Sequence, residues 1–186
     1  YAMNAQPRQI TVSLAISSKY STEAVADIYE GMIHAANHYG VDIIGGDTTS
    51  SLQGLVISIT AIGEAKDEEL VYRNGAKEND IICVTGDLGG AYIGLNILER
   101  EKEVFKANDK IQPDLEGNDY VLERILKPEA RGDIIELLAS MKVKPTSMID
   151  ISDGLASEIF HICTQSEVGC SVYEDKLPID HQTILT

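Results

Sequence analysis

Residues 41–49, Val-Asp-Ile-Ile-Gly-Gly-Asp-Thr-Thr, pass from a short apolar run to two glycines, an aspartate and two threonines. The run at 41–44 predicts a short buried strand that ends at the glycines. Glycine lets a ligand approach the backbone, and a carboxylate at a strand end can hold Mg²⁺ against phosphates. The segment 45–49 is therefore a candidate binding segment. The structural alternative is a tight turn in which Asp47 caps the backbone.

Regular elements are expected on both sides of this stretch. Residues 9–17 and 54–62 have the β-branched, alternating character of strands. Between the first of these and residue 41, a helix is expected over 23–39. Ser21 or Thr22 can cap its start, and Gly40 can end it.

A polar, charged segment at residues 63–70 marks a predicted domain boundary, with one domain over 1–65 and another over 70–186. Strands and helices alternate beyond it, which predicts an α/β or α+β fold. The expected strands are 81–85, 147–151 and 170–173. The expected helices are 86–103, 119–126, 129–141 and 155–165.

A second acidic strand end lies at residues 150–155, Asp-Ile-Ser-Asp-Gly-Leu. In a strand, Asp150 and Ser152 project to one side, and Asp153 falls at the start of the next helix. A capping role accounts for Asp153 but leaves Asp150 unexplained. Two carboxylates and a hydroxyl within four residues favour a metal or phosphate site.

Three further features are weaker evidence for a binding site. The Gly-Asp-Leu-Gly-Gly segment at 86–90 is neither a P-loop nor a dinucleotide fingerprint, and a turn capped by Asp87 explains it better. Arg73 is equally a phosphate contact or a solvated loop arginine. His34 and His38 have helical spacing but no third zinc ligand, which favours surface or partly buried histidines.

The bulk composition excludes some partners. The net charge is −15, from 30 acidic and 15 basic residues, which argues against direct binding to nucleic acid or an anionic membrane. Three cysteines without paired spacing predict reduced core thiols in a cytoplasmic protein. Neither a membrane span nor a signal peptide is recognisable, and the start without an initiator Met suggests an internal fragment.

Taken together, the segments resemble the thiamine-monophosphate kinase family. The resemblance runs in order through Ala-Met-Asn-Ala-Gln-Pro at 2–7, Gly-Gly-Asp-Thr at 45–48, Arg-Asn-Gly-Ala-Lys at 73–77, Val-Thr-Gly at 84–86 and Ile-Asp-Ile-Ser-Asp-Gly-Leu at 149–155. It continues through Lys127-Pro128 with Arg131, and through Leu-Pro-Ile at 177–179.

The resemblance implies the two-domain fold of aminoimidazole ribonucleotide synthetase. In that fold an N-terminal α/β domain forms a homodimer, and a C-terminal α+β domain closes over ATP. The implied ATP contacts are Tyr29, Gly46, Asp47, Arg73 and Ser152. The implied Mg²⁺ ligands are Asp47, Asp150 and Asp153.

The activity implied is ATP-dependent phosphorylation of thiamine monophosphate to thiamine diphosphate by direct in-line transfer. The family's acidic N-terminal segment and its thiamine-enclosing C-terminal portion have no counterpart in residues 1–186, so the chain alone is expected to be inactive. Two alternatives remain: another ATP-dependent enzyme of the same superfamily, and a non-catalytic nucleotide-binding or dimerising remnant.

Overall fold

The structure is a computed structural model that describes residues 1–108 and 110–185. The chain divides into two compact units. Unit 1 comprises Tyr1–Tyr72 and Gly132–Met148, and unit 2 comprises Arg73–Arg131 and Ile149–Thr186. The segment 132–148 thus clusters with the N-terminal residues rather than with its neighbours in the sequence.

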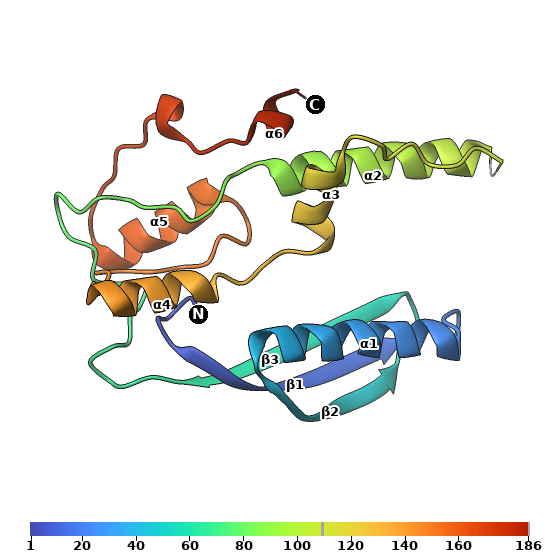
Figure 1. The fold of residues 1–186 in the computed structure, drawn as a ribbon, viewed down its shortest axis with the longest axis horizontal. Coiled ribbons are helices and arrows are strands. Elements are labelled where there is room, and N and C mark those ends of the chain that lie inside the picture. The colour runs from blue at the N-terminus through green and yellow to red at the C-terminus, as the bar shows by residue number, and fades with distance from the viewer. Residues whose placement is uncertain (109, 186) are drawn as a thin grey trace. The chain divides into compact units, whose positions relative to one another are not determined.

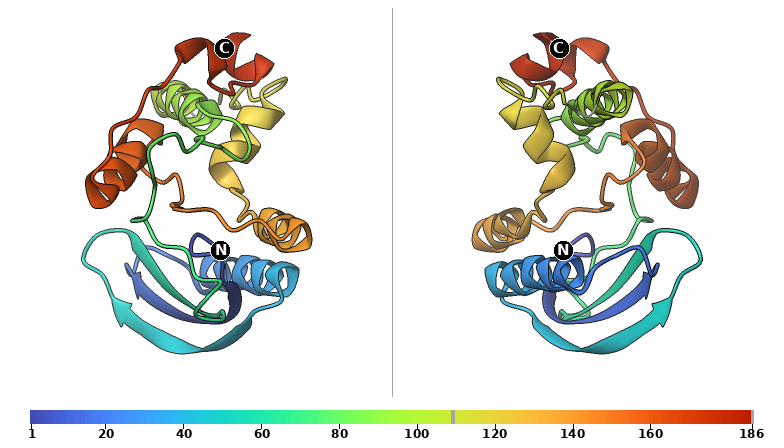
Figure 2. Two further views of the ribbon diagram at one scale, coloured as in Figure 1. Left: turned by 90° about the vertical axis from the view of Figure 1, so that its left-hand side faces the viewer. Right: turned by 90° about the vertical axis from the view of Figure 1, so that its right-hand side faces the viewer.

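Unit 1 contains a three-stranded sheet of β1 (Gln6–Ile16), β2 (Asp42–Ser50) and β3 (Leu55–Glu64) in the order β2-β1-β3. The central strand pairs parallel with β2 and antiparallel with β3. Helix α1 (Thr22–Tyr39) connects the two parallel strands, as a parallel pair requires. It lies against one face of the sheet (Figures 1 and 2).

The signals at both ends of α1 are confirmed. The Ser21 hydroxyl accepts the Ala24 N–H at 3.2 Å, which satisfies one of the unpaired donors of the first turn. Gly40 ends the helix in the left-handed conformation, with φ of 63°. On the same face of the sheet, Val12 and Leu14 of β1 are buried.

The prediction that β2 ends before the glycines is wrong. Strand β2 continues from Asp42 through the whole glycine segment to Ser50. Its register with β1 passes from Ile10 opposite Ile43 to Thr11 opposite Gly45, so Ile44 forms a bulge. Pairing with the central strand, which no local pattern reveals, keeps the segment extended.

Unit 2 is helical over its described residues. It contains α2 (Gly90–Ala107), α3 (Asp119–Leu126), α5 (Leu155–Ser166), a 3₁₀ turn at Glu174–Lys176 and the short α6 (His181–Leu185), while α4 (Gly132–Met141) belongs to unit 1. Ile97 of α2 and Val121 and Leu122 of α3 form a buried cluster. The two helices pack closely because α2 presents Gly94 there: a Cβ at that position would lie 2.1 Å from the Val121 carbonyl oxygen.

The strands predicted at 81–85, 147–151 and 170–173 are wrong, since none of these segments is a strand in the described structure. A strand needs a neighbour to complete its hydrogen-bond ladder, and the described part of unit 2 supplies none. Many of the side chains are correspondingly open to solvent, and Ile81 is 87% exposed.

Two sequence-based expectations concern the chain as a whole. Within the described residues, no helix is long and apolar enough to cross a membrane. The expectation of core thiols is wrong, because Cys83 and Cys170 are exposed and Cys163 is only half-buried. All three cysteines are free.

Candidate nucleotide and metal site

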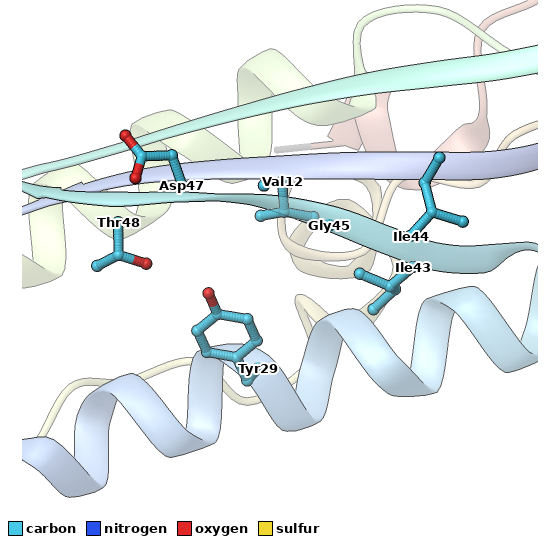
Figure 3. Close-up of a pocket in the computed structure, with 8 residues that line it drawn as sticks. Val12, Tyr29, Ile43, Ile44, Gly45, Asp47 and Thr48 are labelled. Carbon is cyan, nitrogen blue, oxygen red and sulfur yellow. The ribbon is translucent and has the colours of Figure 1, made fainter.

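A pocket of about 510 Å³ in unit 1 brings together three predicted site residues, Tyr29, Gly46 and Asp47. It lies between α1 and β2, and the phenol of Tyr29 points from the helix toward the strand (Figure 3). The remaining lining residues are Val12, Ile43, Ile44, Gly45 and Thr48.

The side chain of Asp47 nevertheless points away from Tyr29. In Figure 3, Ile43 and Thr48 face the helix, whereas Asp47 projects from the opposite side of the strand. Its cross-strand neighbours are Ser13 on β1, and then Ser58 on β3. Because paired residues share a face, these three exposed side chains form a polar row on the sheet face opposite α1. This row can meet a ligand or a cation from solvent.

Gly46 has a structural role that the sequence did not suggest. Its φ is 156°, and a Cβ there would lie 1.7 Å from the carbonyl oxygen of Val12. Gly45, at φ of 152°, has nothing within 4 Å of the same position. The sheet itself therefore requires glycine at 46, whether or not a nucleotide also contacts it.

In unit 2 the structure brings together Arg73, Asp150 and Ser152. The Ser152 hydroxyl donates to Asp150 Oδ2 at 2.5 Å. This hydrogen bond, aided by a backbone hydrogen bond and the Arg73 guanidinium, holds the pKa of the exposed Asp150 carboxyl below its usual range. An exposed carboxylate is ionised near neutral pH in any case, so Asp150 offers an accessible oxygen donor that suits a metal ion.

Asp153 is also exposed, but it does not cap α5, so the capping interpretation is wrong. The helix begins after Gly154 without a side-chain capping bond. Instead, the Asp153 backbone N–H donates to Glu158 Oε1 at 3.4 Å. The Asp153 carboxylate is thereby left facing solvent rather than the helix end.

The donor chemistry fits Mg²⁺ better than a protein-enclosed metal. Among the described residues, no three His, Cys, Asp or Glu side chains gather closely enough to hold a metal, and His34 and His38 are simply exposed on α1. Mg²⁺ does not need such a cage, because it keeps several waters and binds through one or two carboxylates together with substrate phosphates. Asp150 and Asp153 in unit 2, and Asp47 in unit 1, supply oxygen donors of that kind.

The glycine segment at 86–90 has a different structure from the one predicted. Asp87 is not a helix cap: it accepts a short hydrogen bond from the Tyr120 hydroxyl, and Arg124 donates to its backbone carbonyl at 3.3 Å. Helix α2 begins after Gly89, without a side-chain cap. These contacts attach the segment to α3 and explain it without a ligand.

Two contacts near the site were not predicted. One is the buried carboxylate of Glu158 on the Asp153 backbone. The other joins Ser166, at the end of α5, to the loop that contains Arg73. An acidic residue in the first turn of a helix hints at the first contact. No local pattern indicates the second, since its partners lie about 90 residues apart.

Comparison with known proteins supports a relationship along nearly the whole chain. The family described as "AIR synthase related protein, N-terminal domain" matches residues 1–65. A thiamine-monophosphate kinase of Bacillus subtilis is 37% identical over 178 residues, which cover 96% of this chain and 52% of that protein.

Solved structures of thiamine-monophosphate kinases also resemble this chain. One described as "AaThiL complexed with AMPPCP and TMP" matches with a TM-score of 0.85 and 27% identity, over 97% of this chain and 54% of that one. Thiamine-monophosphate kinase from Stenotrophomonas maltophilia matches with a TM-score of 0.80 and 29% identity, over 97% of this chain and 54% of that one. The chain spans about half the length of the relatives that it matches.

Proposed function

We propose that the chain belongs to the thiamine-monophosphate kinase family over the part of those enzymes that it spans, and that the protein containing it phosphorylates thiamine monophosphate. The γ-phosphoryl group of ATP passes directly to a phosphate oxygen of the acceptor. The bond from the γ-phosphorus to the bridging oxygen breaks as the new phosphorus–oxygen bond forms. The products are ADP and thiamine diphosphate.

The observation that carries this proposal is the grouping of Arg73, Asp150 and Ser152 in unit 2. The Ser152 hydroxyl and the Arg73 guanidinium lower the pKa of Asp150, and the carboxylate remains exposed. A planar guanidinium beside an ionised, accessible carboxylate offers one group for a phosphate and one for a metal. The alternative is that Arg73 and Asp150 form an ion pair that only stabilises the fold. Such a pair would require neither an exposed carboxylate nor the additional hydroxyl of Ser152.

We assign Arg73 and Ser152 to ATP, and Asp47, Asp150 and Asp153 to Mg²⁺. Mg²⁺ supplies charge screening when it is bound, because ATP and thiamine monophosphate are both anions. Tyr29 and Gly46 complete the proposed nucleotide contacts. No general base is assigned, since a phosphate monoester is already largely ionised near neutral pH. Catalysis then depends on positioning and electrostatics.

AMPPCP and TMP in the related structure support ATP and thiamine monophosphate as the two ligands. We also propose that residues 1–65 belong to an ATP-binding and dimerising domain, and that 70–186 are part of a second, α+β domain. Exposed apolar side chains on β3 support a homodimer: Val56, Ile57, Ile59 and Ile62 are 56%, 43%, 52% and 45% exposed. Free thiols support a cytoplasmic location.

Competing acceptors test the proposal. The full-length protein is incubated with Mg·ATP and either thiamine monophosphate, an aminoimidazole precursor or selenide, and the products are separated by chromatography. We expect thiamine diphosphate and ADP in equal amounts, with no product from the other acceptors. Turnover of another acceptor, with thiamine monophosphate left unchanged, would contradict the assignment.

A further inference from the structure

The loop that begins at Arg73 is attached to the end of helix α5 by a single hydroxyl. Ser166 Oγ accepts the backbone N–H of Gly75 at 3.1 Å and that of Ala76 at 3.2 Å. It also donates to the Arg73 carbonyl at 3.4 Å. One side chain thus binds the backbone of Arg73, Gly75 and Ala76, which lie 90 to 93 positions before it in the sequence.

These bonds constrain the conformation of the loop. Two successive N–H groups that converge on one acceptor fix the peptide planes on both sides of Gly75. Gly75 has φ of 117°, a conformation that side chains other than glycine rarely adopt, so the chain turns sharply there. Because the Arg73 carbonyl is also bound, the backbone from which the guanidinium extends is held in place.

Helix α5 therefore contacts two parts of the candidate site in unit 2. Asp150, Ser152 and Asp153 immediately precede its first residue, Leu155, and Ser166 is its last. The helix is 12 residues long, or about 18 Å at 1.5 Å per residue, and acts as one rigid element.

We propose that Ser166 is a positioning residue, which holds the Arg73 loop so that the guanidinium stays beside Asp150 and reaches the phosphates of ATP. This inference rests on the proposed function, in which Arg73 contacts ATP. Ser166 does not touch the nucleotide: it acts through the backbone of the Arg73 loop. The competing explanation is that Ser166 only stabilises unit 2.

A double-mutant cycle separates these explanations. The variants are Ser166→Ala, Arg73→Ala and the double mutant, in the full-length protein. The dissociation constant of Mg·ATP is measured by calorimetric titration, and thermal unfolding is followed in parallel. Thr164→Ala, an exposed position on the same helix, is the matched control. Ser166→Thr keeps the hydroxyl and serves as the conservative variant.

Positioning predicts that Ser166→Ala weakens Mg·ATP binding about tenfold, as expected for losing hydrogen bonds that orient a charged contact. In the Arg73→Ala background the same change should alter the constant less than about twofold. Thr164→Ala and Ser166→Thr should bind like the wild type. If Ser166→Ala fails to fold, Ser166→Cys, of similar size but a poorer acceptor, takes its place in the cycle.

Either of two results would overturn the inference about Ser166 and leave the proposed function intact. One is a normal dissociation constant for Ser166→Ala when Arg73→Ala binds weakly. The other is an equal loss of affinity from Ser166→Ala in both backgrounds, which indicates an effect independent of Arg73. If Arg73→Ala itself binds Mg·ATP normally, the assignment of Arg73 in the proposed function fails, and the inference fails with it.

Discussion

Residues 45–49 and 150–154 look alike in sequence, since each joins glycine, aspartate and a hydroxyl after an apolar run, but different forces hold them. The first segment is extended inside β2, where the backbone of β1 excludes a side chain at Gly46. The second lies outside any strand, where side chains position it: Ser152 on Asp150, and Glu158 on the Asp153 backbone. A similar sequence pattern is therefore held by the sheet backbone in one place and by side-chain hydrogen bonds in the other.

The largest effect should come from Gly46→Ala. The new methyl group would overlap the Val12 carbonyl, and the backbone is strained for any residue with a Cβ. We expect the free energy of unfolding to fall by roughly 3–5 kcal/mol. Urea unfolding followed by circular dichroism measures it.

Gly45→Ala is the matched control, because its φ is nearly the same but the space is open. It should cost only about 1–2 kcal/mol, from backbone strain alone. Equal losses in the two variants would show that the approach of β1 does not set the requirement at Gly46.

Unlike Gly46→Ala, Asp150→Asn should affect ligand binding and leave stability almost unchanged. The carboxylate is exposed, so the free energy of unfolding should change by no more than about 0.5 kcal/mol. If Asp150 binds Mg²⁺ as proposed, the loss of its charge should weaken Mg·ATP binding by about 10- to 100-fold. Calorimetric titration tests this, with Asp175→Asn, another exposed aspartate of unit 2, as the control. A destabilised Asp150→Asn variant with normal affinity for Mg·ATP would show that Asp150 has a structural role and does not bind the metal.

A third glycine segment, at 86–90, is held in another way, by side-chain contacts with α3. Tyr120→Phe leaves the partly buried Asp87 carboxylate without its hydroxyl donor. We expect unfolding to become easier by about 1–3 kcal/mol. Tyr92→Phe, at a tyrosine that is 68% exposed, should change stability by no more than about 0.5 kcal/mol.

The same contact predicts an alkaline titration. The hydrogen bond to Asp87, together with burial, raises the pKa of Tyr120 to about 12. A raised pKa contributes stability that is complete below the unfolded value of about 10 and is lost as pH rises through 12. The phenolate absorbance of the wild type should include a titration step near pH 12 that is lost in Tyr120→Phe. The same late titration in the variant would refute the assignment.

Features of the fold and of the site could be predicted from the sequence where the interactions that determine them are local. Helix α1 followed from Ser21 and Gly40, since caps are local in sequence. The extension of β2 through its glycines depends on β1, and the strands expected in unit 2 lack a described neighbour. Among the proposed site residues, Asp47 and Asp150 could be selected from the sequence because each follows an apolar run. Ser166 could not, because a contact across 90 residues leaves no local pattern.

The smallest predicted effect concerns the second segment alone. In Ser152→Ala the pKa of Asp150 should rise toward its ordinary value of about 3.9, because the main cause of the lowering is gone. In the wild type, the stability from this carboxylate is present above the unfolded pKa and is lost as pH falls through the lower folded pKa. In the variant this contribution should be smaller, because the folded pKa lies closer to the unfolded one. Carbon NMR of the Asp150 carboxyl follows the change, and an unchanged midpoint would remove Ser152 as its cause.

The most direct test of the central claim is titration of the full-length protein with ATP, with Mg²⁺ present and with Mg²⁺ chelated. The account predicts saturable binding that depends on Mg²⁺, because the proposed ligands at 47, 150 and 153 are carboxylates that meet the phosphates through the metal. Equal affinity after chelation, or no binding in either condition, would contradict it.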